Sequence, residues 1–595
     1  MGSGISLNRE QQWMVDNLDD NMVVIAGAGS GKTLSLVERY NNLLDHGVDP
    51  ESIILTTFGK EASEEIEERV NVDPDQNKLN IGTIHSLCRQ ILRQDYKDTN
   101  YSKAPRTKVG YGRRKFADSI IEDHMDEMNM NKRDYDLRDD IKFVFLKNVD
   151  TQRRKGNFPD ESEASFDVLT QEDKNKIGQF SKVKKILREQ FQEMYADYRE
   201  KMYEKNVMDY GQMIFETWLL LKENDDVREE YARKYEHIMV DEAQDLNRIQ
   251  YDIFKYLSGG ENLVLIGDDS QCIYSFRGSD PSLMRDFKKE FDAKKVVFER
   301  NYRSYQEIVD VVNKINTKLD EAEVKSLLSN DGNNGNDSHP RVKHMSPQDV
   351  AHQVLQLVEE GYALEEIAIL GRTNRDVEDY QKELERLTIP TRNAGNDDFI
   401  DRWDVNKAYA YLRAGLKKDD EAMERLMQNR NVYNIEQVKR DMNEDSLVEF
   451  MEDLSFNPKN ISKKKARKLK NDMEFIESIT PENAFEKIES KKFHPRGFTD
   501  SVEAMEDIYN NLGAEDFFNF MEIDREDTVT CATVHQAKGK EWDAVFVVNV
   551  DKGSFPREDD PEEKRIFYVA CSRPKERLYV TYQKEPSEFV RWIGG

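Results

Sequence analysis

The segment that most limits the possible fold is MVVIAGAGSGKT at residues 22–33, where an apolar run meets a glycine-rich turn. It matches the pattern GxxxxGK[ST], with Ala26 at the first position. Such a turn, placed between a strand and a helix, lets backbone N–H groups surround phosphates. We therefore expect Lys32 to reach the β- and γ-phosphates of a nucleotide and Thr33 to hold Mg²⁺. A chance glycine turn is the alternative, and the flanking strand and helix disfavour it. The expected phosphate loop comprises Ala26, Gly27, Ala28, Gly29, Ser30 and Gly31.

A second segment, HIMVDEAQD at residues 237–245, has the form of a buried strand that ends in two acidic residues. Asp241 is expected to hold Mg²⁺ through water, and Glu242 to orient or deprotonate an attacking water. The alternative is the start of a capped helix, where acidic residues are also favoured. Beside a phosphate loop, the catalytic interpretation is preferred.

Apolar runs alternate with longer amphipathic stretches over residues 20–93 and 236–300, which indicates a parallel sheet covered by helices. A second set of runs predicts a second α/β core. Charged, strand-poor regions at 95–205 and 415–515 interrupt the cores and are interpreted as helical insertions. The expected strands are 22–26, 52–57, 237–240, 263–266, 296–298, 367–370, 545–550 and 578–581.

The overall composition says more about the size and cellular location of the protein than about its function. At 595 residues the chain is long enough for about three to five structural units. Its formal net charge of -29 argues against a polyanion ligand overall, although a binding groove depends on local charge. Solubility or adaptation to high salt would each explain the acidic surface. The four cysteines are dispersed, and no signal-like or membrane-spanning run is present, so we expect a cytoplasmic protein without membrane association.

Further segments extend the pattern along the chain, and together they resemble the UvrD/Rep/PcrA-like helicases of superfamily 1A. The resemblance follows the family's order over nearly the whole sequence and implies two RecA-like motor cores. The segments are LNREQ (7–11), AGAGSGKT (26–33), TFGKEASEEI (57–66), GTIHSLCRQIL (82–92), VDEAQD (240–245), GDDSQCIYSFRG (267–278), ERNYRS (299–304), TVHQAKGKEWDAVFV (533–547) and YVACSRPKERLYVTY (568–582).

The resemblance implies further contacts to ATP. Gln11 would read the adenine edge through its amide, and Tyr302 would offer a face to the base. Glu541 would meet the ribose. The γ-phosphate would be contacted by Gln271, Arg303 and Arg573. Because Arg573 belongs to the second core, its role would require the two cores to close over the nucleotide.

The resemblance also implies a track for single-stranded DNA, in which bases stack on aromatic side chains whatever their sequence. Ordinary core packing is the alternative for Tyr274 and Phe276. Lys-rich KKKARKLK (463–470) is preferably a solvated helix face, with a phosphate contact as the alternative. The expected DNA-binding residues are Phe58, His85, Tyr274, Phe276, Arg277 and His535.

Some positions depart from the family pattern. Leu34 stands where many relatives have an arginine, and Glu61 where a basic residue is usual. NRNVYNIEQV (429–438) lacks the glycines of the duplex-gripping turn, so a reduced second insertion is expected. The given sequence ends shortly after the last motif, so we expect the partner-binding tail of some relatives to be missing.

The predicted function is an ATP-dependent DNA helicase moving 3′→5′ as a monomer, with Mg²⁺, on single strands and single-/double-strand junctions. The alternatives are a helicase subunit of a helicase-nuclease or defence complex, a nucleotide-switched DNA-binding protein, and RNA unwinding. Repair, recombination and replication all use such a motor, and accessory repair, replication or defence proteins are expected as possible partners. The predicted domains are first core 1–94 and 206–306, helical insertion 95–205, second core 307–414 and 516–595, and reduced insertion 415–515.

Overall fold

The computed structural model describes most of the chain, which folds as two compact units. Unit 1 comprises Met1–Met345 and Lys538–Gly595, and unit 2 comprises Ser346–Ala537. The described residues are 7–72, 79–107, 111–128, 130, 134–275, 278–320, 322–323, 325–330, 340–393, 403–417, scattered positions between 475 and 488, 505, and 528–593.

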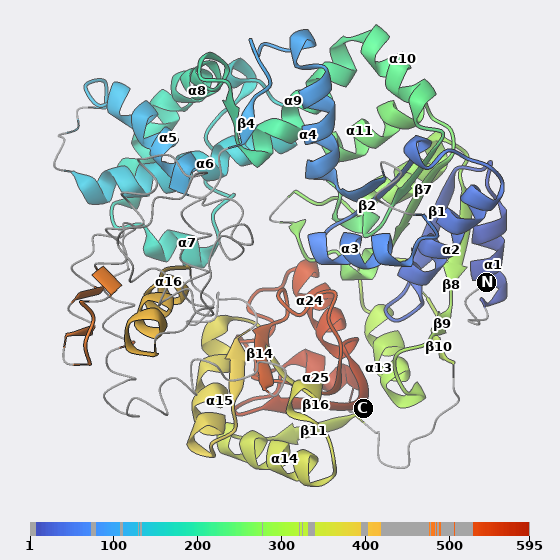
Figure 1. Cartoon of the computed structure of the whole chain (residues 1–595). Helices are drawn as coiled ribbons and strands as arrows, with labels where there is room; N and C mark the ends of the chain where they lie inside the picture. Colours follow the sequence, from blue (N-terminus) through green and yellow to red (C-terminus); the bar gives the residue numbers. More distant parts are fainter. Residues whose placement is uncertain are drawn as a thin grey trace, which may run out of the picture. The chain divides into compact units, whose positions relative to one another are not determined.

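Unit 1 contains a six-stranded parallel sheet with the order β3-β2-β6-β7-β1-β8 (Figure 1). Met22 of β1 lies opposite Val264 of β7 on one side and opposite Lys294 of β8 on the other. The carboxyl ends of parallel strands meet at one edge, so the loops that follow β1, β6 and β7 converge there. The strands are β1 (Met22–Ala26), β2 (Ile53–Thr57), β3 (Asn80–Thr83), β6 (His237–Val240), β7 (Leu263–Gly267) and β8 (Lys294–Phe298).

Both faces of this sheet are covered, which is why its central strands are continuous apolar runs. Every residue of β1, β2, β6 and β7 is buried. Successive side chains alternate between the faces, so Val23 and Ile25 join one apolar cluster while Val24 joins the other. The covering helices are α1 (Arg9–Asp16), α2 (Lys32–Asp45), α3 (Lys60–Arg69), α4 (Ile84–Gln94), α9 (Tyr210–Glu223), α10 (Asp225–Lys234), α11 (Arg248–Ser258) and α12 (Ser282–Glu290).

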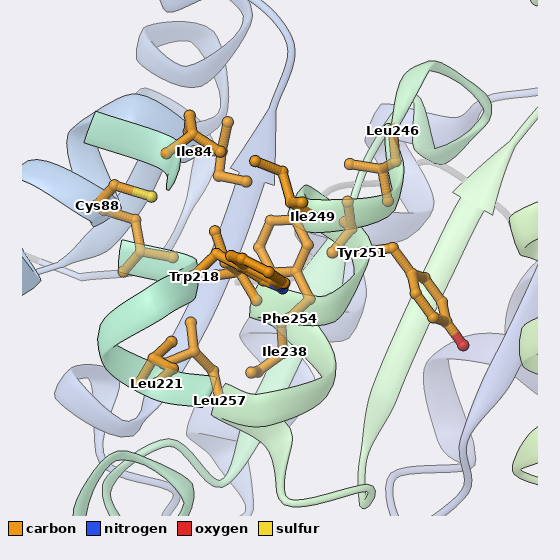
Figure 2. Packing of buried hydrophobic residues seen from close by; sticks show 14 of the residues in the cluster. Ile84, Cys88, Trp218, Leu221, Ile238, Leu246, Ile249, Tyr251, Phe254 and Leu257 are labelled. Carbon is orange, nitrogen blue, oxygen red and sulfur yellow. The ribbon is translucent and has the colours of Figure 1, made fainter. Parts of the chain in front are cut away.

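Figure 2 shows how one of these clusters packs. Cys88 of α4, Trp218 of α9 and Phe254 of α11 meet beside Ile238 of β6, and all four are at most 6% exposed. Helices from distant parts of the sequence are therefore fixed against the same sheet face. This packing holds the strand ends, and the loops leaving them, in a constant arrangement.

The segment between α4 and α9 is helical and has an apolar cluster of its own. Ion pairs join its ends: buried Asp209 accepts hydrogen bonds from Arg153 Nη1 at 2.7 Å and from Arg113 Nε at 2.9 Å. The segment falls in the range predicted as a helical insertion. Its elements are β4 (Arg106–Thr107), α5 (Tyr111–Asp123), α6 (Tyr135–Arg154), α7 (Gln171–Lys176), α8 (Phe180–Glu204) and β5 (Val207–Met208).

A second set of strands pairs in parallel within each unit. Within unit 1 its elements are β11 (Arg341–His344), β15 (Trp542–Val547), α24 (Pro561–Cys571), β16 (Pro574–Tyr582) and α25 (Glu588–Ile593). Unit 1 also holds β9 (Arg300–Asn301), α13 (Gln306–Asn316) and β10 (Leu328–Ser329). Unit 2 has α14 (Pro347–Glu359), β12 (Ile367–Gly371), α15 (Asn374–Arg386), β13 (Thr391–Asn393), α16 (Trp403–Leu412) and β14 (Val529–Thr533).

The fold is therefore α/β with parallel sheets, as predicted for two RecA-like cores. Of the eight expected strands, only 22–26 and 237–240 have the limits that were predicted. Ser52 precedes β2 as part of a helical turn, and the strand expected at 545–550 is β15, which begins at Trp542 and ends at Val547. Asn549 has a φ of 55°, which ends the extended conformation there.

Several predictions fall outside the described residues. These are Phe276, Arg277, the segments 429–438 and 463–470, and nearly all of the insertion expected at 415–515. Among the residues that the structure does describe, no helix is both long and apolar enough to cross a membrane.

Candidate nucleotide and nucleic-acid site

The glycine-rich loop between β1 and α2 has the backbone needed to surround phosphates. Gly29 and Gly31 take positive φ values of 67° and 76°, and Gly31 directly precedes the first helical residue, Lys32. Ser30 closes the turn, because its N–H and its hydroxyl both donate to Gly27 O, at 3.3 and 2.7 Å. The free N–H groups at the start of α2 then form a site for an anion.

The segment after β8 fixes this loop from the other side. The N–H of Tyr302 donates to Gly29 O at 2.7 Å, and the Asn301 amide donates to Ala28 O at 2.8 Å. A Cβ atom added at Gly29 would lie 2.5 Å from the Cβ of Arg303. Gly29 is thus required both for its backbone angle and for the close approach of the neighbouring segment.

Two carboxyl groups follow β6 and face the first helical residue of α2. Lys32 Nζ lies 3.2 Å from Glu242 Oε1. Burial, with a smaller contribution from Glu242, raises the pKa of Asp241. Burial alone would also raise the pKa of Glu242, but Lys32 and Lys538 outweigh it and hold that pKa below its usual value. Carboxylate and hydroxyl oxygens are hard ligands, so the side chains of Asp241 and Thr33 are of the type that binds Mg²⁺.

The structure brings Gln11 and Tyr302 together at the start of α1. Gln11 is 1% exposed, and its amide already binds protein groups: Oε1 accepts from Asn8 N at 3.0 Å and Nε2 donates to Ser30 O at 2.9 Å. The Tyr302 hydroxyl lies 3.4 Å from the same Oε1, and its ring is 40% exposed. Reading an adenine edge would therefore require Gln11 to exchange at least one of these bonds.

Arg573 lies in unit 1 with the phosphate loop, although it comes from the C-terminal segment. Its guanidinium is buried and donates to Gln271 Oε1 at 2.8 Å, Ser572 Oγ at 2.9 Å, Val569 O at 3.0 Å and Lys540 O at 3.3 Å. Two residues predicted to contact the γ-phosphate, Gln271 and Arg573, thus contact each other directly.

The other predicted arginine, Arg303, is held by the same C-terminal segment. Its Nε donates to Glu541 Oε2 at 2.6 Å and its Nη1 to Ser572 O at 3.2 Å. Burial and the positive charge of Arg303 lower the pKa of Arg573 to about 9. The two guanidinium groups therefore place positive charge close together, and the negative charge of a polyphosphate would stabilise this arrangement. The Arg303–Glu541 ion pair was not foreseen from the sequence.

Aromatic side chains follow three strands of the first sheet: Phe58 comes after β2, His85 after β3 and Tyr274 after β7. Phe58 is 51% exposed and stacks on Tyr274, with ring centroids 5.4 Å apart and planes at 6°. His85 meets Tyr210, itself 51% exposed, edge to face at 5.0 Å. No motif in the sequence indicates a role for Tyr210. Of the remaining predicted DNA contacts, His535 lies in unit 2.

Lys538 is a further residue that motif reasoning did not select. Its Nζ forms an ion pair with Asp245 at 2.5 Å, donates to Gln271 O at 2.9 Å and lies 4.8 Å from the ring centroid of Tyr274. Burial raises the pKa of Asp245 to about 6, although Lys538 opposes that shift. Lys538 thus links the strand-end acidic segment to the loop that carries Gln271 and Tyr274.

A phosphate loop after β1, an acidic pair after β6 and clustered arginines together define an α/β P-loop nucleotide hydrolase. Family comparisons narrow this class. The model of the UvrD/REP helicase N-terminal domain matches residues 7–292, and that of the UvrD-like helicase C-terminal domain matches residues 296–514 and 433–585. The chain belongs to the UvrD-like helicase family.

Individual relatives agree with this assignment. ATP-dependent DNA helicase PcrA of Staphylococcus epidermidis is 26% identical over 639 residues, covering 97% of this chain and 83% of the relative. The protein of the same name from Staphylococcus aureus is 26% identical over 649 residues, covering 98% and 84%. A probable DNA helicase II homologue of Mycoplasma capricolum is 27% identical over 655 residues, covering 98% and 87%.

Proposed function

We propose that the protein hydrolyses ATP to move 3′→5′ along single-stranded DNA and to separate duplex ahead of it. Membership of the UvrD-like helicase family supports ATP use and DNA helicase activity. The direction of movement follows the resemblance of the motifs in both cores.

One observation carries the coupling between fuel and movement. The loop after β7 contains Gln271, which binds Arg573, and Tyr274, which stacks on exposed Phe58. Only two residues separate Gln271 from Tyr274 along the chain. A change at the γ-phosphate that moves Gln271 would therefore shift an aromatic surface on which a base can stack.

The chemistry is phosphoryl transfer to water. Lys32 and the N-terminus of α2 bind the phosphates, and Glu242, kept ionised by Lys32, orients and deprotonates the attacking water. Arg303 and Arg573 stabilise the charge that spreads over the transferred phosphoryl group, an effect worth about 10³-fold or more in rate. Thr33 and Asp241 would hold Mg²⁺, and the chemistry that this ion would supply is charge neutralisation of the phosphate oxygens.

The DNA path is proposed to cross the exposed ring of Phe58, the half-buried ring of Tyr274 and the His85–Tyr210 pair. Stacking is worth about 1–3 kcal/mol per base and does not depend on base identity. A motor that must cross arbitrary sequence needs that tolerance. The preferred substrate is a single-/double-strand junction, and we propose that the protein acts as a monomer in the cytoplasm, in DNA repair, recombination or replication, with the six domain segments predicted above.

An unwinding assay with 3′-tailed, 5′-tailed and blunt duplexes across a salt series tests the proposal. We expect ATP-dependent unwinding of the 3′-tailed duplex alone, and ATP hydrolysis that single-stranded DNA stimulates. Lys32→Ala is the matched control, because it removes the phosphate contact and should abolish hydrolysis while the fold persists. Absence of DNA stimulation in the wild-type protein would exclude the helicase proposal. Competing RNA strands would reveal a ribonucleic acid preference instead.

A further inference from the structure

Lys325 is buried in unit 1, in the segment between α13 and β10 and outside every recognised motif. Its side chain has no exposed surface. Nζ donates to Asp268 Oδ1, to Asp269 Oδ1 at 3.0 Å and to Ser270 Oγ at 3.1 Å. All three ammonium protons therefore have acceptors in the loop that follows β7, the loop that also carries Gln271.

Asp268 connects Lys325 to two further side chains. Its Oδ1 binds Lys325, while its Oδ2 accepts from Gln271 Nε2 at 2.8 Å and from the Tyr568 hydroxyl at 3.3 Å. With Nε2 held in this way, the amide oxygen of Gln271 faces Arg573 Nη2 at 2.8 Å. A flipped amide would place two donors against each other, because a guanidinium has no acceptor.

The charges agree with this chain of contacts. Burial alone would lower the pKa of Lys325, but Asp268 and Asp269 outweigh it and raise that pKa. Burial alone would raise the pKa of Asp268, and Lys325 with Lys32 holds it below its usual value. The ammonium and the carboxylate are thus both ionised, which keeps the acceptor at Asp268 Oδ2 strong for the Gln271 amide.

We propose that Lys325 is a positioning residue for ATP hydrolysis: through Asp268 it fixes the amide of Gln271 and thereby the guanidinium of Arg573. The inference rests on the proposed function, since it assigns a role in that reaction to a residue that touches neither nucleotide nor DNA. Loss of Lys325 leaves the binding groups for ATP in place but releases the orientation of the group that stabilises the transition state.

The first test compares Lys325→Met with Lys318→Met, an exposed lysine in the same segment as a matched control. In saturating single-stranded DNA, Lys325→Met should lower kcat of ATP hydrolysis by about tenfold or more, equivalent to about 1.4 kcal/mol or more. Its KM for ATP should stay close to that of the wild type. A raised KM with unchanged kcat, or no change in a folded Lys325→Met protein, overturns the inference.

A double-variant experiment separates positioning from general support of the fold. If Lys325 acts through Gln271, then Lys325→Met/Gln271→Ala should be no slower than Gln271→Ala alone. Multiplied losses in kcat would contradict action through Gln271. Should Lys325→Met fail to fold, Tyr568→Phe removes only the hydroxyl that donates to Asp268 Oδ2. Tyr568→Phe should also lower kcat, but it should cause no further loss when Gln271 is already alanine. An unchanged kcat in the single variant overturns the inference.

The wild-type protein distinguishes the two proposals. If it shows no DNA-stimulated ATP hydrolysis, the proposed function fails. If it is active and the Lys325 and Tyr568 variants match it, only the positioning role fails.

Discussion

Replacing Arg573 by alanine separates ATP binding from ATP hydrolysis. The guanidinium donates four hydrogen bonds, one of them to Gln271, and it feels the positive charge of a second arginine, Arg303. Because ground-state phosphates are also bound by Lys32 and the phosphate loop, the change should remove mainly an interaction of the transition state. We expect a large fall in kcat and a small change in affinity for ATP.

The expected magnitude follows from the role. An arginine that stabilises a transferring phosphoryl group contributes about 10³-fold or more, or about 4 kcal/mol at roughly 1.4 kcal/mol for each tenfold change. Stability will also fall, since truncation leaves the buried acceptors at Gln271 and Val569 without this donor. Each such loss costs about 1–3 kcal/mol, so melting temperature has to be measured beside activity.

The assay has three parts. Steady-state hydrolysis with saturating single-stranded DNA gives kcat, fluorescence titration with a labelled ATP analogue gives Kd, and thermal melting reports the fold. Arg577→Ala, on the same strand β16, is the matched control and should leave kcat nearly unchanged. Equal losses in kcat and in ATP affinity in a folded protein would refute the assignment of Arg573 to the transition state.

Three further outcomes are expected. Gly29→Ala should lower the melting temperature more than Gly47→Ala, because both glycines have positive φ but only at Gly29 would a Cβ meet a neighbour; equal losses would contradict this reason. Phe58→Ala should weaken binding of single-stranded DNA by about 1–3 kcal/mol alike for oligo-dT and mixed sequences in fluorescence anisotropy, and a loss for one sequence alone would argue against stacking. Burial, assisted by Arg39, lowers the pKa of His237 to about 4, so its contribution to stability is present above the unfolded pKa of about 6.5 and is lost as pH falls towards 4. His237→Gln should therefore lose less melting temperature than the wild type between pH 7.5 and 5, and parallel curves would exclude this source of acid sensitivity.

The sequence predicted the central strands of the first sheet because burial on both faces demands continuous apolar runs. MVVIA and HIMV have this form, and they became β1 and β6. β14, with the sequence VTCAT, is equally buried but was missed, since its threonines resemble a half-exposed strand. β3, with the sequence NIGT, was missed because it lies at the sheet edge and needs little apolar surface.

The phosphate loop and the acidic pair could be predicted for a related reason, since local chemistry fixes their residue types and spacing. Pairings between distant segments could not. Nothing local in the sequence indicates that Glu541 binds Arg303, or that Lys325 is buried against Asp268. In a chain with 88 lysines and arginines, a single buried lysine has no recognisable pattern. The roles assigned to individual site residues remain predictions.

The short run from Asn301 to Tyr305 has a mechanical consequence. At one end Tyr302 N–H holds Gly29 O of the phosphate loop; at the other, Ser304 Oγ donates to Pro574 O and Tyr305 N–H to Lys575 O of β16. These few residues therefore connect the phosphate loop directly to strand β16. A displacement of β16 is transmitted through these hydrogen bonds to the phosphate loop, even when no ligand contacts both.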